Sequence, residues 1–280
     1  MNTVEIFNLD AQEFMAKIPD QIVDVIVTDP PYWTLDKWRV IGTTTRLGGN
    51  RNADDQRPEM FFETIDQDYL WECIGEFSRI LKSDGHLYVF CDDIVAPILL
   101  NWIREAETGF EDAHMLIWDK VNMGMGYHYR HVYECIIFAW KKGKRRLADL
   151  GMPDLFRDIK RITGGYPTQK PAALVSKFIT QSARPGDVLC DPFAGSGVLA
   201  EATPPGHNCQ ILLNDKAMAS QQWMLEHLKG KAMLLGLGDS IQFRGENAGF
   251  QYADGALRGR VGVVRECPSL GASEPVSAET

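Results

Sequence analysis

The most constraining feature of this sequence is an apolar, β-branched run that ends in an acidic, proline-rich turn. Residues 22–28 (IVDVIVT) form the run, and residues 29–33 (DPPYW) follow it directly. A continuous apolar run of this length is typical of a strand that is covered on both faces of a sheet. In open α/β sheets, ligands bind outside the carboxyl ends of such strands. We therefore expect a ligand site at residues 29–33.

Strand-like runs alternate with segments of helical spacing along most of the chain, which predicts an α/β fold with a doubly wound, mostly parallel sheet. Strands are expected at residues 4–9, 22–28, 86–91, 114–118, 132–140, 187–190 and 210–214. Helices are expected at residues 68–81, 93–105, 171–182, 197–202 and 217–228. The periodicity fades beyond about residue 230. Residues 1–230 are therefore expected to form the catalytic domain and residues 231–280 a C-terminal extension, of which 266–280 are expected to be disordered.

Composition is that of a soluble globular protein, with 45% hydrophobic and 24% charged residues. No run of eighteen apolar residues is present, and the first ten residues do not resemble a signal peptide, so we expect a cytoplasmic protein that does not associate with membranes. The six cysteines form no CxxC pair, and the six histidines have no HxxxH or HExxH spacing. We therefore predict free thiols and no metal site.

The net charge of −9 by itself argues against a nucleic-acid partner, because phosphate binding needs clustered Lys and Arg. One basic cluster is nevertheless present, consisting of Lys141, Lys142, Lys144, Arg145 and Arg146. An isolated cluster of this kind is usually a solvated loop. Its position relative to the ligand site decides between the two interpretations.

The residues that follow the first strand are suited to bind an amino group on a flat ring. The Asp29 carboxylate and the Pro30 carbonyl, held by the fixed φ angles of Pro30 and Pro31, offer two acceptors for the two hydrogens of –NH2. Tyr32 and Trp33 offer ring faces on which a base could stack. The alternative is an ordinary proline-rich turn after a strand.

An amine attached to an aromatic ring is a poor nucleophile because its lone pair is delocalised into the ring. Two acceptors pull such an amine toward a tetrahedral form and stabilise the positive charge that develops on it. A base must leave the duplex stack to reach such a site, which costs a few kcal/mol. Stacking on an aromatic side chain returns about 1–3 kcal/mol.

A second candidate ligand site lies at residues 187–198 (DVLCDPFAGSGV), where a strand ends at Asp191 and a glycine-rich loop leads into a helix. Gly195 and Gly197 allow close approach of the backbone to a ligand, and Asp215 ends the next strand, where it could bind ribose hydroxyls. This loop alone equally suits an NAD-binding domain. The two ligand-binding strand ends in one sheet are a stronger signal than either motif alone.

Together these motifs resemble the amino-DNA methyltransferases, which methylate N6 of adenine or N4 of cytosine. Residues 29–32 resemble the catalytic tetrad of that family, 191–197 its cofactor loop, and 168–171 (TQKP) the segment that precedes the loop. Segments 118–120 (WDK) and 130–138 (RHVYECIIF) resemble those that line the target-base pocket. The tetrad precedes the cofactor loop, as in the permuted β group, and the resemblance covers roughly residues 4–228.

The resemblance implies a Rossmann-like, seven-stranded sheet with one antiparallel strand and a circularly permuted motif order, in which the first strand lies beside residues 210–214. It implies S-adenosyl-L-methionine as cofactor and double-stranded DNA as partner. The implied catalytic residues are Asp29, Pro30, Pro31 and Tyr32. The implied cofactor-binding residues are Asp10, Asp29, Lys170, Asp191, Phe193, Ala194, Gly195, Ser196, Gly197 and Asp215.

Within the implied cofactor site, Asp10 would lie at the adenine, Asp215 at the ribose, and Asp191 with the backbone of residues 193–195 at the methionine part. The alternative for Lys170 is an ordinary surface lysine before a helix. An Asp rather than a Ser at the start of the tetrad indicates adenine rather than cytosine as the target.

Target recognition would fall to two loops, residues 34–58 and 141–166, together with Trp33 and the basic cluster Lys141, Lys142, Lys144, Arg145 and Arg146. Members of the resembled group are often dimers, so a homodimer is also expected. The alternative functions are methylation of cytosine N4, of RNA or of a protein amide, an inactive DNA-binding relative, and an NAD-dependent oxidoreductase.

Overall fold

A computed structural model describes residues 1–35, 63–105, 108–121, 128–143, 145–162, 165–166, 168–235, 237, 241–244, 249–253 and 256–260. Most of the candidate loop 34–58, residue Lys144 and the expected disordered tail 266–280 lie outside the described residues.

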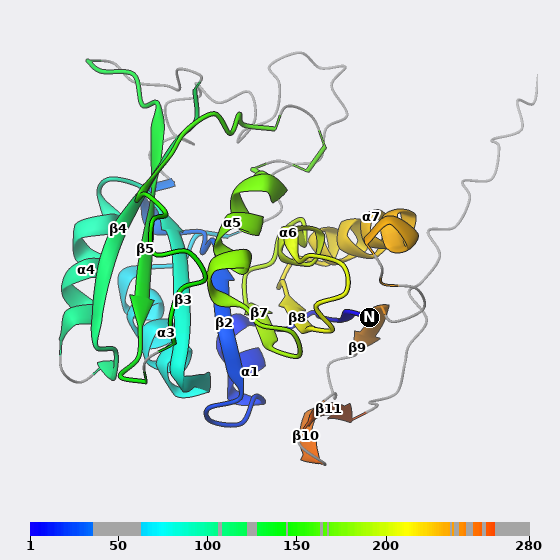
Figure 1. The fold of residues 1–280 in the computed structure, drawn as a ribbon. Helices are drawn as coiled ribbons and strands as arrows, with labels where there is room; N and C mark the ends of the chain where they lie inside the picture. Colours follow the sequence, from blue (N-terminus) through cyan, green and yellow to red (C-terminus); the bar gives the residue numbers. More distant parts are fainter. Residues whose placement is uncertain are drawn as a thin grey trace, which may run out of the picture.

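The elements alternate as predicted over most of the chain (Figure 1). The strands are β1 (Thr3–Phe7), β2 (Val23–Thr28), β3 (Leu81–Cys91), β4 (Asp112–Asp119), β5 (Tyr133–Trp140), β6 (Leu155–Phe156), β7 (Val188–Asp191), β8 (Gln210–Asn214), β9 (Ile241–Arg244), β10 (Gly249–Ala253) and β11 (Ala256–Arg260). The helices are α1 (Ala11–Ala16), α3 (Gln67–Ile80), α4 (Val95–Arg104), α5 (Ala172–Ser182), α6 (Val198–Ala202) and α7 (Met218–Leu235), with a short 3-10 turn η1 (Trp33–Leu35).

The apolar run that ends in β2 is buried on both faces because successive side chains of a strand point to opposite sides. Ile26 belongs to one hydrophobic core, whereas Val25 and Val27 belong to the other. Helices α1, α3 and α4 cover the first face and α5, α6 and α7 cover the second (Figure 1). The expected doubly wound architecture is thus confirmed, since helices cover both faces of the sheet.

The main sheet has the strand order β6-β4-β5-β3-β2-β7-β8-β1-β9. All neighbouring pairs are parallel except those of β5, which is antiparallel to β3 and to β4. The expected neighbourhood of the first strand is confirmed, since β1 pairs in parallel with β8 from Thr3↔Gln210 to Phe7↔Asn214.

The prediction of seven strands is wrong in number, because the described sheet has nine. The two additional strands are short and lie at the two edges, β6 beside β4 and β9 beside β1. Strand β6 has two residues, too few for a periodic pattern in the sequence, and β9 follows the point at which the helical spacing fades. The two edge strands extend the sheet without altering the order of the seven expected strands.

The C-terminal part of the chain is partly integrated into the domain. Helix α7 continues past residue 230 to Leu235, and Leu235 and Leu237 are buried in the second core. Strands β10 and β11 form a separate two-stranded hairpin. The boundary at residue 230 stays a prediction.

Within the described residues, no helix is long and apolar enough to cross a bilayer.

The basic cluster after β5 lies at the edge of the sheet opposite the carboxyl ends of the parallel strands, because β5 runs antiparallel to β3 and ends where β3 begins. The backbone N–H of Lys141 donates to the carbonyl of Gly85, and its Nζ donates to the carbonyl of Ser78 at 2.7 Å. The structure therefore does not bring this cluster to the expected ligand site.

Arg145 is a structural residue and not a phosphate-binding one, which corrects its assignment as a DNA contact. Its side chain is 4% exposed and forms ion pairs with Asp24 and Asp187. Both carboxylates lie at the amino ends of strands, Asp24 in β2 and Asp187 just before β7. Arg145 thus links the amino-terminal ends of β2 and β7 through its two ion pairs. Among the described members of the basic cluster, only Lys142 and Arg146 are exposed.

We predict that Arg145→Met lowers the free energy of unfolding by about 3–5 kcal/mol, because it removes the cation that pairs with Asp187 and leaves Asp24 with Lys82 alone. Urea unfolding at pH 7 measures this loss. The control is Arg146→Met at the adjacent exposed position, for which we expect a change within about 0.5 kcal/mol. Equal effects of the two substitutions would contradict a structural role for Arg145.

Candidate active site

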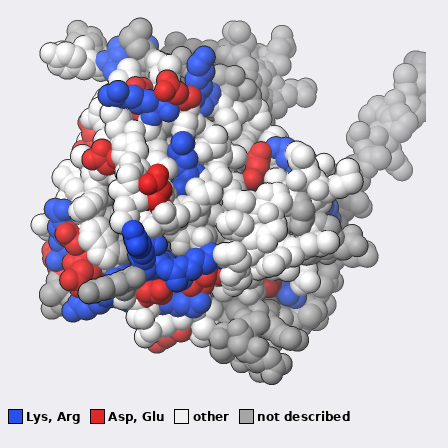
Figure 2. All heavy atoms as spheres, viewed as in Figure 1, with Lys and Arg blue, Asp and Glu red and all other residues white. Residues whose placement is uncertain are grey.

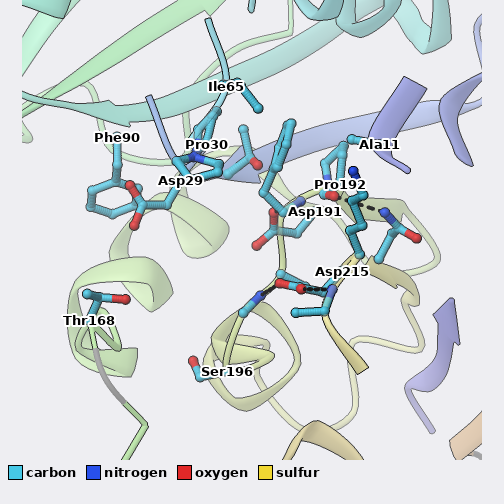
Figure 3. A pocket seen from close by; sticks show the side chains of 18 of the residues that line it. Ala11, Asp29, Pro30, Ile65, Phe90, Thr168, Asp191, Pro192, Ser196 and Asp215 are labelled. Atoms are coloured by element: carbon cyan, nitrogen blue, oxygen red, sulfur yellow. Dashed lines mark hydrogen bonds between the residues drawn. The ribbon is translucent and has the colours of Figure 1, made fainter. Parts of the chain in front are cut away.

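The candidate site is a cavity of about 790 Å³ at the carboxyl ends of β2 and β7. These neighbouring strands lead in opposite directions along the sheet, since the chain passes from β2 to β3 on one side and from β7 to β8 on the other. A crevice opens at such a switch point, where open α/β sheets bind ligands. Figure 3 shows Asp29 and Asp191 projecting from these two strand ends into the same space.

The tetrad after β2 is held in one conformation by its own backbone. The N–H of Tyr32 donates to the Pro30 carbonyl at 2.9 Å, and the N–H of Ile65 donates to the Pro31 carbonyl at 2.8 Å. The Pro30 carbonyl therefore has one lone pair left for a ligand, fewer than the sequence suggested. Tyr32 is 7% exposed and lines the cavity, which places its ring where the prediction requires.

Trp33 does not lie where the stacking role requires. It begins the turn η1, is partly buried, and packs against the first hydrophobic core. It is absent from the described residues that line the cavity. Of the two aromatic side chains that end the motif, only Tyr32 faces the site, because the turn at η1 directs the next side chain into the core.

Asp29 is paired with a buried lysine. Nζ of Lys170 lies 2.6 Å from Oδ2 of Asp29 and 2.7 Å from Oε1 of Glu134. The alternative of an ordinary surface lysine is thus wrong, since the Lys170 side chain is 12% exposed. Burial raises the pKa of Asp29 and Lys170 opposes that rise, while the two carboxylates keep the pKa of Lys170 above its usual value despite its burial.

Asp191, at the end of β7, is a carboxyl group whose ionised form is disfavoured by burial. It is 4% exposed, and burial raises the pKa of its carboxyl to about 7. Its Oδ1 accepts the N–H of Phe193 at 3.0 Å, which fixes the first residue of the glycine loop that follows Pro192. A buried carboxyl of this kind suits a cationic ligand group, because a positive charge would restore its ionised form.

The glycine loop is tied to the next strand by Asp215. The two oxygens of this carboxylate accept the N–H groups of Gly195 at 2.9 Å and of Ala217 at 2.8 Å. Burial raises the pKa of Asp215. The loop residues Ala194 and Ser196 are each 4% exposed and line the cavity with Phe193. The predicted cofactor loop is thus brought together with Asp191 and Asp215.

Gly197 is required by both conformation and space. Its φ is +76°, and a Cβ atom there would lie 2.9 Å from Cγ of Met224. Gly195 has φ +49°, and its Cβ would lie 3.4 Å from the ring of Tyr166. These two glycines let the loop turn into α6 between the apolar residues of the second core and the wall formed by Tyr166.

Asp10, which caps α1, also lines the cavity. Its Oδ1 accepts the N–H of Gln12 at 3.1 Å and the hydroxyl of Tyr69 at 2.6 Å. Asp10, Asp191 and Asp215 therefore line one cavity from the ends of β1, β7 and β8. A row of carboxylates beside backbone N–H groups suits a polar ligand with hydroxyl and amino groups, whereas the Asp29 end suits an amine.

Four functional candidates were not singled out in the sequence: Tyr69, Phe90, Glu134 and Tyr166. Tyr69, Phe90 and Tyr166 line the cavity, and Phe90 lies beside Asp29 in Figure 3. The carboxyl-edge rule could have indicated Phe90, which lies next to the last residue of the expected strand 86–91. Glu134 lies within the segment 130–138 that carries the family resemblance, but no local pattern distinguishes it. In the part of the chain that the structure describes, no cluster of three or more His, Cys, Asp or Glu could hold a metal.

Comparisons with known proteins place these features in a family context. The sequence profile of the N6/N4 DNA methylase family matches residues 23–204. DNA adenine methyltransferase YhdJ of Escherichia coli K12 is 28% identical over 224 residues, which cover 67% of this chain and 70% of that protein. The type II methyltransferase M.HhaII of Haemophilus parahaemolyticus is 28% identical over 200 residues, covering 70% of this chain and 80% of that protein.

Two solved structures share the fold at low sequence identity. The complex of M1.HpyAVI with SAM has a TM-score of 0.57 and 22% identity, and covers 80% of this chain and 100% of that one. The cytosine-N4-specific PvuII DNA methyltransferase has a TM-score of 0.55 and 15% identity, and covers 86% of this chain and 95% of that one.

We predict that Asp191→Asn stabilises the ligand-free protein, increasingly so as the pH rises toward 7. The folded-state pKa of about 7 exceeds the usual 3.8, so wild-type stability falls as pH rises between these values and levels off above 7. Asparagine removes this ionisation cost, which amounts to roughly 1–4 kcal/mol at pH 8. Thermal unfolding from pH 5.5 to 8.5 measures the difference, and a gain independent of pH would contradict the shifted pKa.

Proposed function

This chain belongs to the N6/N4 DNA methylase family, and from that premise we propose that it methylates the exocyclic N6 amine of adenine in double-stranded DNA with S-adenosyl-L-methionine as methyl donor. The observation that carries the proposal is that one cavity is lined both by the Asp29 acceptor and by residues 191–196 of the glycine loop. Acceptor and donor sites that share one cavity allow direct transfer between two bound groups.

The lining of the cavity fits the proposed cofactor. Asp191 suits the ammonium of its methionine part, Asp215 the ribose hydroxyls, and Asp10 the adenine amine. The N–H groups of the loop, together with the positive φ angles at Gly195 and Gly197, allow close approach of the backbone. When bound, the cofactor supplies an electrophilic methyl group on a sulfonium.

The residues at the Asp29 end would position the amine. One hydrogen of the amine would be accepted by Asp29 and the other by the remaining lone pair of the Pro30 carbonyl. Tyr32 would stack on the flipped base, and burial keeps the pKa of its hydroxyl well above the usual value, so its ring stays neutral. The amine nitrogen would then attack the methyl group in line as the bond from that methyl to sulfur breaks and leaves a neutral thioether, and the extra proton on the methylated nitrogen would pass to water after transfer.

Adenine is proposed over cytosine because Asp29 opens the tetrad and because YhdJ is named as an adenine methyltransferase. The solved PvuII enzyme of the same fold is named cytosine-N4-specific, so N4 methylation of cytosine is the second candidate. Family membership disfavours the NAD-dependent alternative, and RNA and protein amides remain substrates for the product analysis to test.

We predict that plasmid DNA incubated with the protein and S-adenosyl-L-methionine acquires N6-methyladenine, and that Asp29→Ala abolishes this product. Mass spectrometry of the nucleosides is the measurement. Isothermal titration of the cofactor into Asp29→Ala, which should bind it nearly as wild type does, is the control for folding. N4-methylcytosine would overturn the base assignment, and the absence of any methylated base in DNA would overturn the proposed substrate.

The DNA contact surface is proposed at the carboxyl edge rather than at the basic cluster after β5. Arg157, Lys160 and Arg161, all exposed, follow β6, and this segment is tied to β4 where Nε1 of Trp118 donates to the carbonyl of Ile159 at 2.8 Å. Burial lowers the pKa of Lys120, whose Nζ lies 3.9 Å from Glu134, and Lys170 and Arg161 lower it further. These contacts support a position beside the cavity.

Figure 2 shows Lys and Arg in separate groups on the face that it displays, so each group must be tested by itself. We predict that Lys160→Ala/Arg161→Ala weakens DNA binding and reduces its dependence on salt. The matched control is Lys142→Ala/Arg146→Ala, which removes the same charge from the opposite edge of the sheet. Fluorescence anisotropy at several salt concentrations measures the DNA affinity of both double variants, and equal losses of affinity would contradict the proposed surface.

The expected homodimer stays a prediction, which sedimentation analysis can test.

A further inference from the structure

Lys170 stands in a row of alternating charges that leads away from the candidate catalytic carboxylate. Its Nζ contacts Oδ2 of Asp29 at 2.6 Å and Oε1 of Glu134 at 2.7 Å, and Oε2 of Glu134 lies 3.9 Å from Nζ of Lys120. The side chains of Lys170 and Glu134 are 12% and 15% exposed. The row therefore runs from the cavity into the wall formed by β4 and β5.

This position is costly for a lysine. Lys170 directly precedes Pro171, the N-cap of α5, so its cation lies near the positive end of a helix dipole. It is also largely buried, and its ammonium lies 5.1 Å from the centre of the Phe90 ring. Burial and the helix dipole both oppose a charged lysine here, and the two carboxylates, together with the face of the Phe90 ring, offset this cost.

The backbone on either side of the row is strained. Thr168, two residues before Lys170, has φ +65°, and Val121, directly after Lys120, also has φ +65°. Both are β-branched, and such residues rarely adopt this conformation. Strained residues persist where the surrounding structure overdetermines them, which often occurs at functional sites. Two such residues beside the two lysines of one row indicate that the lysine positions are constrained.

We propose that Lys170 is a positioning residue for Asp29, and that Glu134 in turn holds Lys170 in place. This inference rests on the proposed methyl transfer and assigns two residues to it. Because Lys170 takes Oδ2, the carboxylate cannot rotate freely and Oδ1 remains the acceptor for the substrate amine. The pair also keeps Asp29 ionised in a buried site, so that it accepts a hydrogen bond from the amine and does not donate one.

The two neighbours act on Asp29 in opposite directions. Lys170 lowers the pKa of Asp29, while burial and Glu134 raise it. The titratable and charged groups that face Asp29 or its two partners are Tyr32, Cys91, Lys120, Glu134, Cys135, Tyr166, Lys170 and Asp191. Among them only Lys170 contacts Asp29 directly, and Glu134 acts beside it by contacting Lys170. Without Lys170, burial and the charge of Glu134 would raise the pKa of Asp29 unopposed.

The test is the pH profile of kcat/KM for DNA methylation in Lys170→Met and Glu134→Gln. In Lys170→Met the acid limb should move to higher pH by about one unit or more, so that activity recovers partly in alkaline buffer. In Glu134→Gln the acid limb should move to lower pH. Lys170→Arg, which keeps the charge and can pair with both carboxylates, should retain an acid limb near that of wild type. A merely structural role would lower activity without moving the limbs in opposite directions.

Cofactor binding separates the competing explanations. Isothermal titration of S-adenosyl-L-methionine should give the wild-type affinity in all three variants if Lys170 acts on Asp29. Loss of cofactor affinity in Lys170→Met with an unmoved acid limb would overturn the inference and make Lys170 a cofactor contact. If Lys170→Met fails to fold by circular dichroism, the shift in Glu134→Gln decides alone. A wild-type protein that methylates no DNA base would contradict the proposed function. If the wild type is active but the acid limbs of the two variants stay where the wild-type limb lies, only the positioning role is contradicted.

Discussion

The parallel pairing of β2 with β7 is the constraint on which the site depends. Val25 pairs with Leu189 and Ile26 with Cys190, so the two strands end at the same edge, and Asp29 and Asp191 emerge side by side there. The chain needs long connections to bring two parallel neighbours together, and those connections supply the helices on both faces. The cavity is therefore a consequence of the topology. The residues at the carboxyl ends of the strands supply its lining side chains.

The site is assembled from carboxylates that the fold holds at a cost. Burial raises the pKa of Asp29, Asp191 and Asp215, but the partners that hold them are of two kinds. Asp191 and Asp215 accept backbone N–H groups of the glycine loop or its neighbours, so they shape the loop as well as face the cavity. Asp29 instead has a lysine, the one partner among these that carries a full positive charge. This difference supports separate tasks for the two ends of the cavity.

Because β5 is antiparallel to its neighbours, charged residues at its start and just after its end lie at opposite edges of the sheet. Its start lies at the carboxyl edge, where Glu134 joins the row beside Asp29, and its end lies at the opposite edge, where Arg145 joins the starts of β2 and β7. In our proposal, this strand of eight residues contributes Glu134 to catalysis near its start and leads at its end into the segment that carries Arg145. The same reversal removes the basic cluster from the vicinity of the cavity.

Much of the fold and the two main motifs could be predicted from the sequence, because they depend on local patterns. Apolar runs determined where the strands of the central sheet lie, with Gln210–Asn214 placed to the residue, and strand-end chemistry indicated Asp29, Asp191 and Asp215. Only the tertiary structure decided what depends on distant contacts: the core position of Trp33, the burial of Arg145, and the pairing of Lys170 with Asp29 and Glu134 across the sheet. Lysines and arginines look alike in a sequence whether they are solvated or buried. Their roles follow from which carboxylates the strand order brings within reach.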